Sequence, residues 1–440
     1  MKVKHISDRA QLLSVADEAL VDDIRYEDFE NHLFNDVLFG KGVALHEAYY
    51  FNSSHLLRHI INSGDESSFF EETAIAGLAI PAISETGINS INELYHYLAY
   101  DKYDNKKEYF QQELFESARF DKYIKNLDFG LATKNNAIFW PEGIGIGYEN
   151  FIRKNFYKQE PPQLPQGQEW IWEESELWRN SCFEEALINS KKIDSNGGLR
   201  RGQLFSSIAK EVGVKNSEKY HSINQILELA KPNPKTSSAL RIFWSWLNQS
   251  YHINFSEKLG LVADLPNYNP NKDFLVDELK INSKNPNDGS SFHHFLVDAP
   301  STEYLLSVNP KKLINTRLGS AADDYFESLN AFQNSPNDST AQHFVKQYQD
   351  YSKEICNLRT FGHKKSKKIP LSLSSSHFQY AGYLTSAISA TTSQPKLVIL
   401  SGAFLAFGLY LRNEEEKLKE YEKEKTEPIL LKVSLNKKSS

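Results

Sequence analysis

The sequence predicts a mainly α-helical protein, and it leaves open an α+β alternative with a small sheet confined to the N-terminal block. In most segments, apolar side chains recur at the spacing of one helix face. Strand-like stretches are few and short, and no repeat of fixed period is present. A chain of 440 residues suggests about three domains, so the expected architecture is multi-domain and helical.

The N-terminal block, residues 1–158, is expected to form a mixed but mostly helical domain. Residues 36–45 read as two short extended pieces around a Gly40-Lys41-Gly42 turn. A helix is expected to begin at Asn52 or Ser53 and to end at Gly64. Residues 78–83 are short, apolar and interrupted by Pro81, which predicts an edge strand or an extended connector.

Residues 159–168 contain three prolines, one glycine and four glutamines, which is typical of a linker. The linker separates the first block from a central, aromatic-rich helical domain, residues 169–300. The last region, residues 301–440, is again expected to be helical, with an apolar segment at 397–411 and a charged tail. The alternating charges of residues 414–427 predict an exposed helix that continues the apolar segment.

The apolar segment decides between a cytoplasmic and a membrane-bound protein. Residues 397–411 carry no charge and, as a helix, would span about 22 Å, against roughly 30 Å of bilayer hydrocarbon. We therefore expect a helix buried inside the protein, with membrane insertion and an oligomer interface as alternatives. The charged residues 1–9, the absence of an apolar run behind them, and only two cysteines predict a cytoplasmic location.

The residues that most resemble a metal site in this sequence are histidines. His55 and His59 are four residues apart, so on a helix they share one face, as paired zinc ligands do. Leu56 stands where the zinc-protease motif has a glutamate, and His46-Glu47 precedes the pair without a defined spacing. We therefore expect no metal, with His55 and His59 as weak candidates and the pair His293-His294 weaker still.

A glycine- and arginine-rich turn is the candidate anion site. Gly197 and Gly198 precede Arg200 and Arg201 at the expected start of a helix, where backbone N–H groups and guanidinium groups can bind phosphate or carboxylate. A flexible turn with solvated arginines is the alternative. The glycine-rich residues 143–147 do not fit the dinucleotide-binding pattern, which requires a preceding strand and a third glycine three positions after the second.

A local basic patch consists of Lys364, Lys365, Lys367 and Lys368. Such a cluster can contact nucleic-acid phosphates or anionic lipid, although a solvated loop between helices is the simpler interpretation. The formal net charge of −7 argues against a broadly basic nucleic-acid-binding surface.

Function is predicted mainly from the absence of a catalytic motif. No nucleophile elbow or cysteine spacing typical of zinc sites is present, so an enzyme is the less favoured class, and the sequence leaves any cofactor and any catalytic residue unidentified. The first hypothesis is a non-catalytic binding, adaptor or regulatory subunit of a larger intracellular assembly, with a protein partner or self-association. The alternatives are a membrane-directed effector that uses residues 364–411, and an enzyme or a nucleic-acid- or nucleotide-binding protein whose site assembles only in three dimensions.

Overall fold

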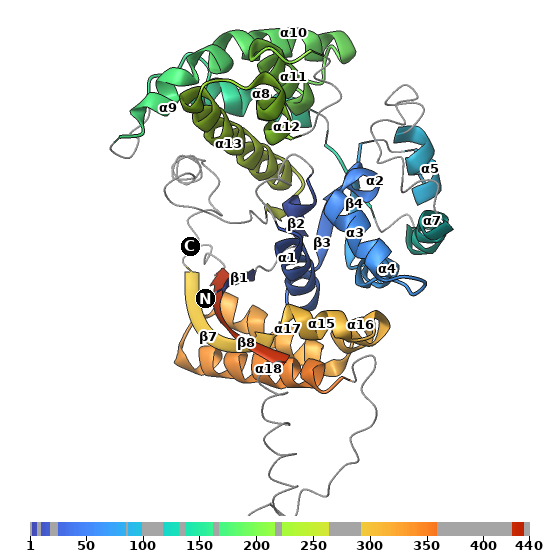
Figure 1. Cartoon of the computed structure of the whole chain (residues 1–440). Coiled ribbons are helices and arrows are strands. Elements are labelled where there is room, and N and C mark those ends of the chain that lie inside the picture. The colour runs from blue at the N-terminus through green and yellow to red at the C-terminus, as the bar shows by residue number, and fades with distance from the viewer. Residues whose placement is uncertain are drawn as a thin grey trace, which may run out of the picture.

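The computed structural model describes residues 2–6, 10–17, 25–84, 87–98, 118–131, 137–141, 143–161, 167–215, 222–263, 292–358 and 425–434. Helices dominate these residues and two small sheets accompany them, which confirms the mainly α prediction (Figure 1). In Figure 1 a helical unit lies at the top, a parallel sheet with its covering helices lies in the middle, and a second sheet with two long helices lies at the bottom. The apolar segment 397–411 and the four lysines of the basic patch are outside the described residues.

The first sheet is built from five parallel strands in the order β5-β4-β3-β2-β6. The chain adds β3, β4 and β5 successively on one side of β2, and then places β6 on the other side. Because the strands are parallel, their carboxyl ends meet at one edge of the sheet, where ligands bind in many open α/β sheets. The strands are β2 (Gln11–Leu12), β3 (Val43–His46), β4 (Ala79–Ile83), β5 (Ile138–Phe139) and β6 (Val262–Ala263).

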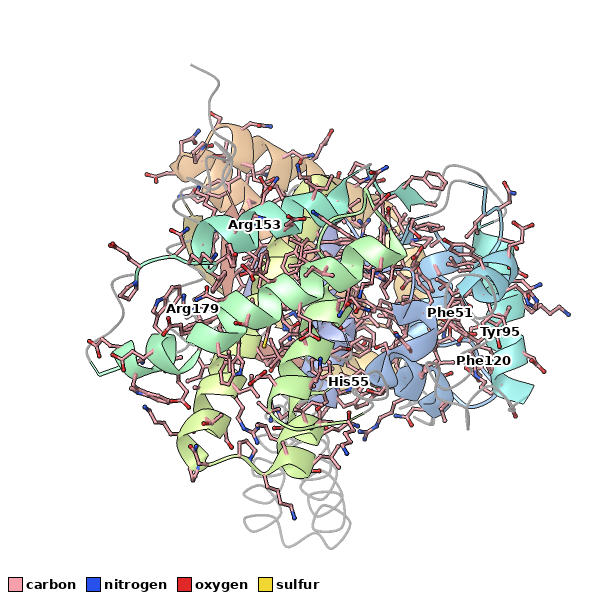
Figure 2. The ribbon with its side chains drawn as sticks, turned by 90° about the horizontal axis from the view of Figure 1, so that it is seen from above. Phe51, His55, Tyr95, Phe120, Arg153 and Arg179 are labelled. Carbon is pink, nitrogen blue, oxygen red and sulfur yellow. The ribbon has the colours of Figure 1, made fainter. Side chains whose placement is uncertain are left out.

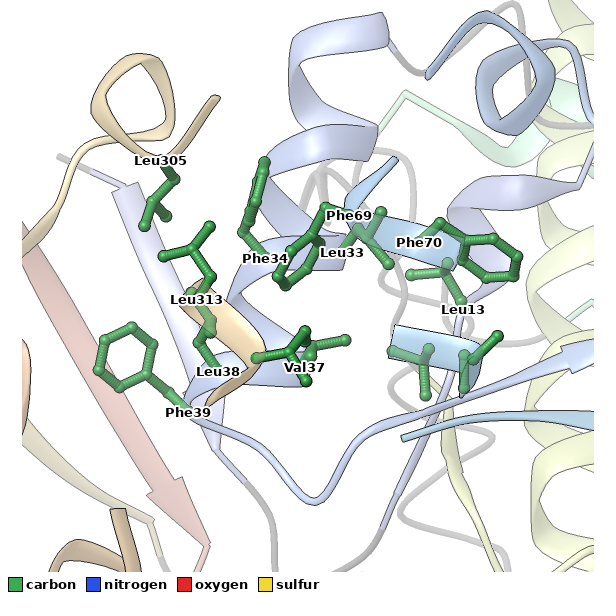
Figure 3. Packing of buried hydrophobic residues seen from close by; sticks show 14 of the residues in the cluster. Leu13, Leu33, Phe34, Val37, Leu38, Phe39, Phe69, Phe70, Leu305 and Leu313 are labelled. Carbon is green, nitrogen blue, oxygen red and sulfur yellow. The ribbon is translucent and has the colours of Figure 1, made fainter. Parts of the chain in front are cut away.

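Alternate side chains of this sheet are buried against different helices. Val43 and Leu45 of β3 point into the core shared with the N-terminal helices, whereas Ala44 points toward Phe255. This shared core is drawn in Figure 3. The helices of the block are α1 (Tyr26–Leu38), α2 (Tyr49–Asn52), α3 (Ser54–Asn62), α4 (Phe69–Ile75), α5 (Ile91–His96) and α7 (Ala118–Leu131).

Local signals located α3 correctly. The side chain of Ser53 accepts a hydrogen bond from the backbone N–H of Leu56, 3.3 Å away, so Ser53 is the N-cap. The helix ends at Asn62, and Gly64 follows with a positive φ of 61°. Both the predicted start at Ser53 and the predicted end near Gly64 are confirmed.

Two predictions in the first block are wrong. Asp36–Leu38 form the last turn of α1 and not an extended piece, because Val37 continues the buried face of that helix. The strand with Pro81 is not at the edge, since β4 lies between β3 and β5. The proline is tolerated there because β5 pairs only with Ala82 and Ile83, so beside Pro81 only β3 is paired.

Three rings from separate helices pack together where α2, α5 and α7 meet. The ring centroids of Phe51 and Tyr95 are 5.5 Å apart, and those of Tyr95 and Phe120 are 6.0 Å apart. Figure 2 shows these three residues on one side of the molecule, and Arg153 and Arg179 in the helical unit on the other. The aromatic contacts hold α5 against α2 and α7 within the first block.

The helical unit has its own core, which begins at Tyr148 and extends to Leu247. Residues on both sides of the predicted boundary at 158 therefore share one hydrophobic cluster. A turn of π-helix, Trp178–Cys182, precedes α10. The helices are α8 (Ile144–Asn155), α9 (Glu169–Glu174), α10 (Phe183–Ile193), α11 (Arg201–Glu211), α12 (Ile223–Ala230) and α13 (Pro234–Lys258).

Helix α13 joins the helical unit to the parallel sheet. Its first half packs in the helical core through Leu240 and Trp244, and Phe255 near its end packs against Ala44 and Ala82 of the sheet. Figure 1 shows α13 reaching from the helical unit down to β2. A single long helix thus places the helical unit over the carboxyl edge of the strands.

The C-terminal region completes the core of the first block. The ring of Phe39 contacts the rings of Tyr348 and Tyr351, with centroid distances of 5.1 and 5.5 Å. Buried residues of the two regions belong to one cluster. The helices are α15 (Thr302–Ser307), α16 (Pro310–Arg317), α17 (Ser320–Asn334) and α18 (Asp338–Cys356).

A second sheet brings distant parts of the chain together in the order β1-β8-β7. Strand β8 is parallel to β1 and antiparallel to β7. Thr426 and Glu427 begin β8, so the exposed helix predicted for residues 414–427 is wrong at these two positions, and residues 414–424 lie outside the described part. The strands are β1 (Lys2–Ile6), β7 (Phe292–Pro300) and β8 (Thr426–Ser434).

Among the described helices, none has the length and apolar character needed to cross a bilayer.

Candidate functional site

Three ionisable side chains from distant segments meet near the carboxyl edge of the parallel sheet. Asp17 follows β2, Arg201 is the first residue of α11, and His252 lies in α13. Arg201 donates hydrogen bonds to both carboxylate oxygens of Asp17, with its Nη2 3.1 Å from Oδ1. Nε2 of His252 is 2.8 Å from Oδ2 of the same carboxylate.

This carboxyl-edge cluster is closed by two further residues of α13. Nη1 of Arg201 is 3.3 Å from Oδ1 of Asn248, and the guanidinium lies 4.4 Å from the ring centroid of Tyr251. Asp17 is 3% exposed and His252 is 1% exposed. The cluster is therefore an ion pair between a buried carboxylate and a guanidinium that is 18% exposed, with its hydrogen bonds supplied by the protein.

The pKa shifts of the cluster have clear physical causes. Burial opposes ionisation of Asp17, but attraction to Arg201 and the hydrogen bond with His252 outweigh burial and lower the pKa of Asp17 far below its usual range. Burial likewise opposes the charge of Arg201, yet the attraction of Asp17 raises the pKa of Arg201. Burial lowers the pKa of His252, so the imidazole is neutral at pH 7, and its Nε2–H donates a hydrogen bond to the Asp17 carboxylate.

The predicted anion site is thus divided by the structure. Arg201 faces the carboxylate of Asp17, whereas the side chain of Arg200 is 42% exposed and lies 4.0 Å from Asp194. Gly197 and Gly198 pack against the backbone of α8, because a Cβ placed on Gly145 would be 1.9 Å from the carbonyl oxygen of Gly197. The carboxylate that Arg201 binds here belongs to the protein itself.

The glycine-rich residues 143–147 serve the same contact. Gly143 has a positive φ of 74° and caps α8, and Gly145 lies in its first turn. A Cβ on Gly198, whose φ is 75°, would be 2.4 Å from the backbone nitrogen of Ile146. Two glycine-rich stretches that are 50 positions apart in the sequence therefore touch backbone to backbone, and neither glycine stretch is open for a ligand at this contact.

The ends of β3 and β4 carry a second polar pair. Glu47 is fully buried, and its carboxylate accepts hydrogen bonds from the backbone N–H and the hydroxyl of Ser84, at 2.7 and 2.8 Å. The neighbouring His46 packs among aromatic rings, 4.8 Å from Trp140 and 5.4 Å from Phe255. Protein side chains thus fill the edge at which open α/β sheets commonly bind ligands.

A pocket lies elsewhere, where the first block meets the C-terminal region. It encloses about 330 Å³ between α1, α3 and α4 on one side and residues 305–313 on the other, and we call it the seam pocket. Its polar wall includes Glu30 and His59, and its apolar wall includes Phe34, Phe69 and Leu313 (Figure 3). This combination of an apolar surface with a few polar groups is typical of small-molecule sites.

The polar wall of the seam pocket is organised around Glu30. Its Oε1 accepts a hydrogen bond of 2.6 Å from the hydroxyl of Tyr26 and lies 3.1 Å from Nδ1 of His59. The side chain of Asn62 donates to the Tyr26 hydroxyl at 3.2 Å. Glu30 and His59 are 4% and 5% exposed, so their geometry is fixed by packing.

The Glu30–His59 pair retains two atoms that can hydrogen-bond a ligand. Within the part of the chain that the structure describes, Nε2 of His59 is buried without a hydrogen-bond partner, and Oε2 of Glu30 forms no hydrogen bond. A buried imidazole nitrogen without a partner is costly, and a ligand or water in the pocket can satisfy it.

The two histidines that were weak metal candidates take different environments. His59 pairs with Glu30, whereas the ring of His55 packs against Tyr26 and Phe29, with centroid distances of 6.1 and 5.8 Å. No group of three or more His, Cys, Asp or Glu side chains is arranged for a metal ion among the described residues. His293 and His294 lie in β7, and their side chains are outside the part of the molecule that the structure describes.

Asp17, His252 and Glu30 are candidate functional-site residues that the sequence alone did not indicate. Asp17 and His252 have no neighbouring motif, because their partners lie 184 to 235 positions away. A weak signal existed for Glu30, since Tyr26 precedes it by one helical turn.

The chain matches no protein-family model, no curated protein and no solved structure.

Proposed function

We propose that the protein is a non-catalytic binding protein that holds a small ligand in the seam pocket. One observation supports the proposal most: His59 and Glu30 are buried beside a cavity of about 330 Å³, and each retains a polar atom without a partner in the described structure. The volume is at the lower end of the range for small-molecule sites, which favours a compact ligand.

The position of the pocket favours a regulatory role. One wall comes from the first block and the other from α15 and α16, which are about 240 positions further along the chain. A ligand in this pocket contacts both regions, so its binding energy also stabilises their contact. We therefore propose that ligand occupancy strengthens the seam between the two regions.

The carboxyl-edge cluster is a weaker basis for a function. Both oxygens of Asp17 and the guanidinium of Arg201 are already engaged within the protein. Perturbed pKa values also occur in structural ion-pair networks, so they do not by themselves indicate catalysis. We propose that the cluster fixes α11 and α13 to the parallel sheet.

A ligand screen with a blocked pocket tests the proposed function. Leu306 lines the pocket and is 45% exposed, so Leu306→Trp fills its mouth without disturbing the core. The matched control is Leu318→Trp, because Leu318 is 55% exposed and does not line the pocket. Thermal unfolding is recorded for each protein with a library of compact amphipathic compounds.

The expected result is a set of compounds that raise the melting temperature of the wild type and of Leu318→Trp but not of Leu306→Trp. The proposal is abandoned if every stabilising compound acts equally on all three proteins. It is also abandoned if the library stabilises none of them.

A further inference from the structure

We infer that the seam pocket takes a small amphipathic amine, whose protonated nitrogen faces Glu30 and Glu66 and whose apolar part lies against Phe34 and Phe69. This inference rests on the proposed function, because it specifies the chemical class of the same ligand.

Carboxylates outnumber basic side chains in the lining of the pocket, and the charge of Arg119, which contacts Ser63 of the lining, is paired with Glu71. The lining contains two carboxylates, Glu30 and Glu66, and His59 is the only basic side chain among the described lining residues. Glu30 is buried, whereas Glu66 is exposed, so one carboxylate lies in the wall and the other lies nearer to solvent. A ligand with a positive charge is attracted by both, whereas an anionic ligand is repelled.

Hydrogen bonding also favours a ligand that donates. Oε1 of Glu30 already accepts from Tyr26 and lies within hydrogen-bond distance of His59, while Oε2 has no donor in the described structure. The lining adds hydroxyl oxygens from Ser67 and Ser68, which can accept further hydrogen bonds. A primary ammonium group has three N–H donors, as the side chain of lysine does, and so matches a wall rich in acceptors.

The opposite wall accommodates an apolar group. The ring centroids of Phe34 and Phe69 are 4.3 Å apart, and Leu305 and Leu313 are buried in the same cluster (Figure 3). Aryl and short alkyl groups gain free energy when such a surface removes them from water. The pocket therefore combines requirements that an arylalkylamine meets and that a free phosphate or a sugar does not.

Three probes of similar size separate charge from shape. Phenethylamine carries a positive charge at pH 7.5, 2-phenylethanol is neutral, and 3-phenylpropionate is negative. Binding of each is measured by isothermal titration calorimetry to the full-length protein. We expect phenethylamine to bind at least about tenfold more tightly than 2-phenylethanol, and 3-phenylpropionate to bind most weakly.

Two variants test the role of the carboxylates. Glu66→Gln removes an exposed charge from the pocket and is expected to weaken phenethylamine binding about threefold while leaving 2-phenylethanol unchanged. Glu303→Gln is the control, because Glu303 is exposed on α15 and does not line the pocket. Glu30→Gln gives a larger loss, and circular dichroism verifies that this variant is folded.

The results separate failure of the amine inference from failure of the proposed binding function. If 2-phenylethanol binds as tightly as phenethylamine and Leu306→Trp abolishes both, the pocket stands and the inference of an amine is overturned. Preferential binding of 3-phenylpropionate overturns it as well. If none of the probes binds and the wider screen finds no ligand that Leu306→Trp blocks, the proposed function itself fails.

Discussion

Nε2 of His252 lies 2.8 Å from Oδ2 of Asp17, although the two residues are 235 positions apart in the chain. The same carboxylate binds Arg201, which is 184 positions from Asp17. The contact therefore joins the segment after β2 to both α11 and α13. The cluster and the apolar packing of Phe255 against the sheet therefore hold α13 at the same sheet.

Replacing Asp17 by alanine is expected to destabilise the protein by about 3 kcal/mol, because it leaves the charge of Arg201 largely buried and unpaired. The free energy of unfolding is measured by urea denaturation followed by tryptophan fluorescence. Arg25→Ala is the control, since Arg25 is 76% exposed in its pair with Asp28, and its midpoint should not move measurably. Equal stability of Asp17→Ala and the wild type would show that the buried pair contributes nothing.

The stability of the protein is expected to fall as the pH decreases from 7.5 to 5.5, partly through His252. Burial lowers the pKa of His252 in the folded state, so below about pH 6.5 the unfolded chain binds a proton that the folded protein does not. This contribution is present above the unfolded pKa and is lost as the pH falls toward the folded pKa. The lowered pKa of Asp17 acts in the same direction, but only below about pH 4.

The variant His252→Gln isolates this effect, because glutamine keeps a neutral donor and does not titrate. The difference in unfolding free energy between pH 7.5 and pH 5.5 should be smaller in the variant than in the wild type. The assignment to His252 is rejected if both proteins lose the same stability over this range.

The contact between the two glycine-rich stretches makes Gly145→Ala strongly destabilising, by about 3 kcal/mol. The added Cβ would be 1.9 Å from the carbonyl oxygen of Gly197, so the backbone of one stretch must move. Gly202→Ala is the matched control, because nothing lies within 4 Å of its Cβ position and alanine favours the helix by about 0.5–1 kcal/mol. Thermal melting of the two variants checks the prediction, and a Gly145→Ala protein as stable as Gly202→Ala would contradict it.

Features set by neighbouring residues could be predicted from the sequence. The ends of α3 were found because Ser53 and Gly64 act within one helical turn of the residues that they cap. Proximity in the chain is also why Gly197 and Gly198 were recognised as a turn just before a helix, whereas residues 144–147 form the start of α8 itself. Their mutual contact was not predicted, because neither stretch contains information about the other.

Features set by distant partners were not predicted. The interior place of β4 depends on pairing with β3 and β5, and Pro81 alone suggested an edge. Strands β1 and β8 pair across almost the whole chain, so neither had a local signal strong enough to be recognised. The pairing of Glu30 with His59 required α1 and α3 to pack together, and the sequence had indicated His59 only as a weak candidate for a metal ligand.

Both cysteine thiols are expected to react slowly in the folded protein. Burial raises the pKa of Cys182 to about 12 and that of Cys356 to about 11. At pH 8 only about one Cys182 side chain in ten thousand is then the reactive thiolate, and Cys182 is also only 2% exposed. A thiol-specific chromogenic disulfide at pH 8 should therefore release little colour within minutes from the native protein and two equivalents from the urea-unfolded protein.

Cys356 is less buried and has the lower pKa, so Cys356→Ser should remove the faster of the two slow native phases. Immediate release of a full equivalent from the native wild type would mean that one of these thiols is accessible and ionised, contrary to its position in the fold.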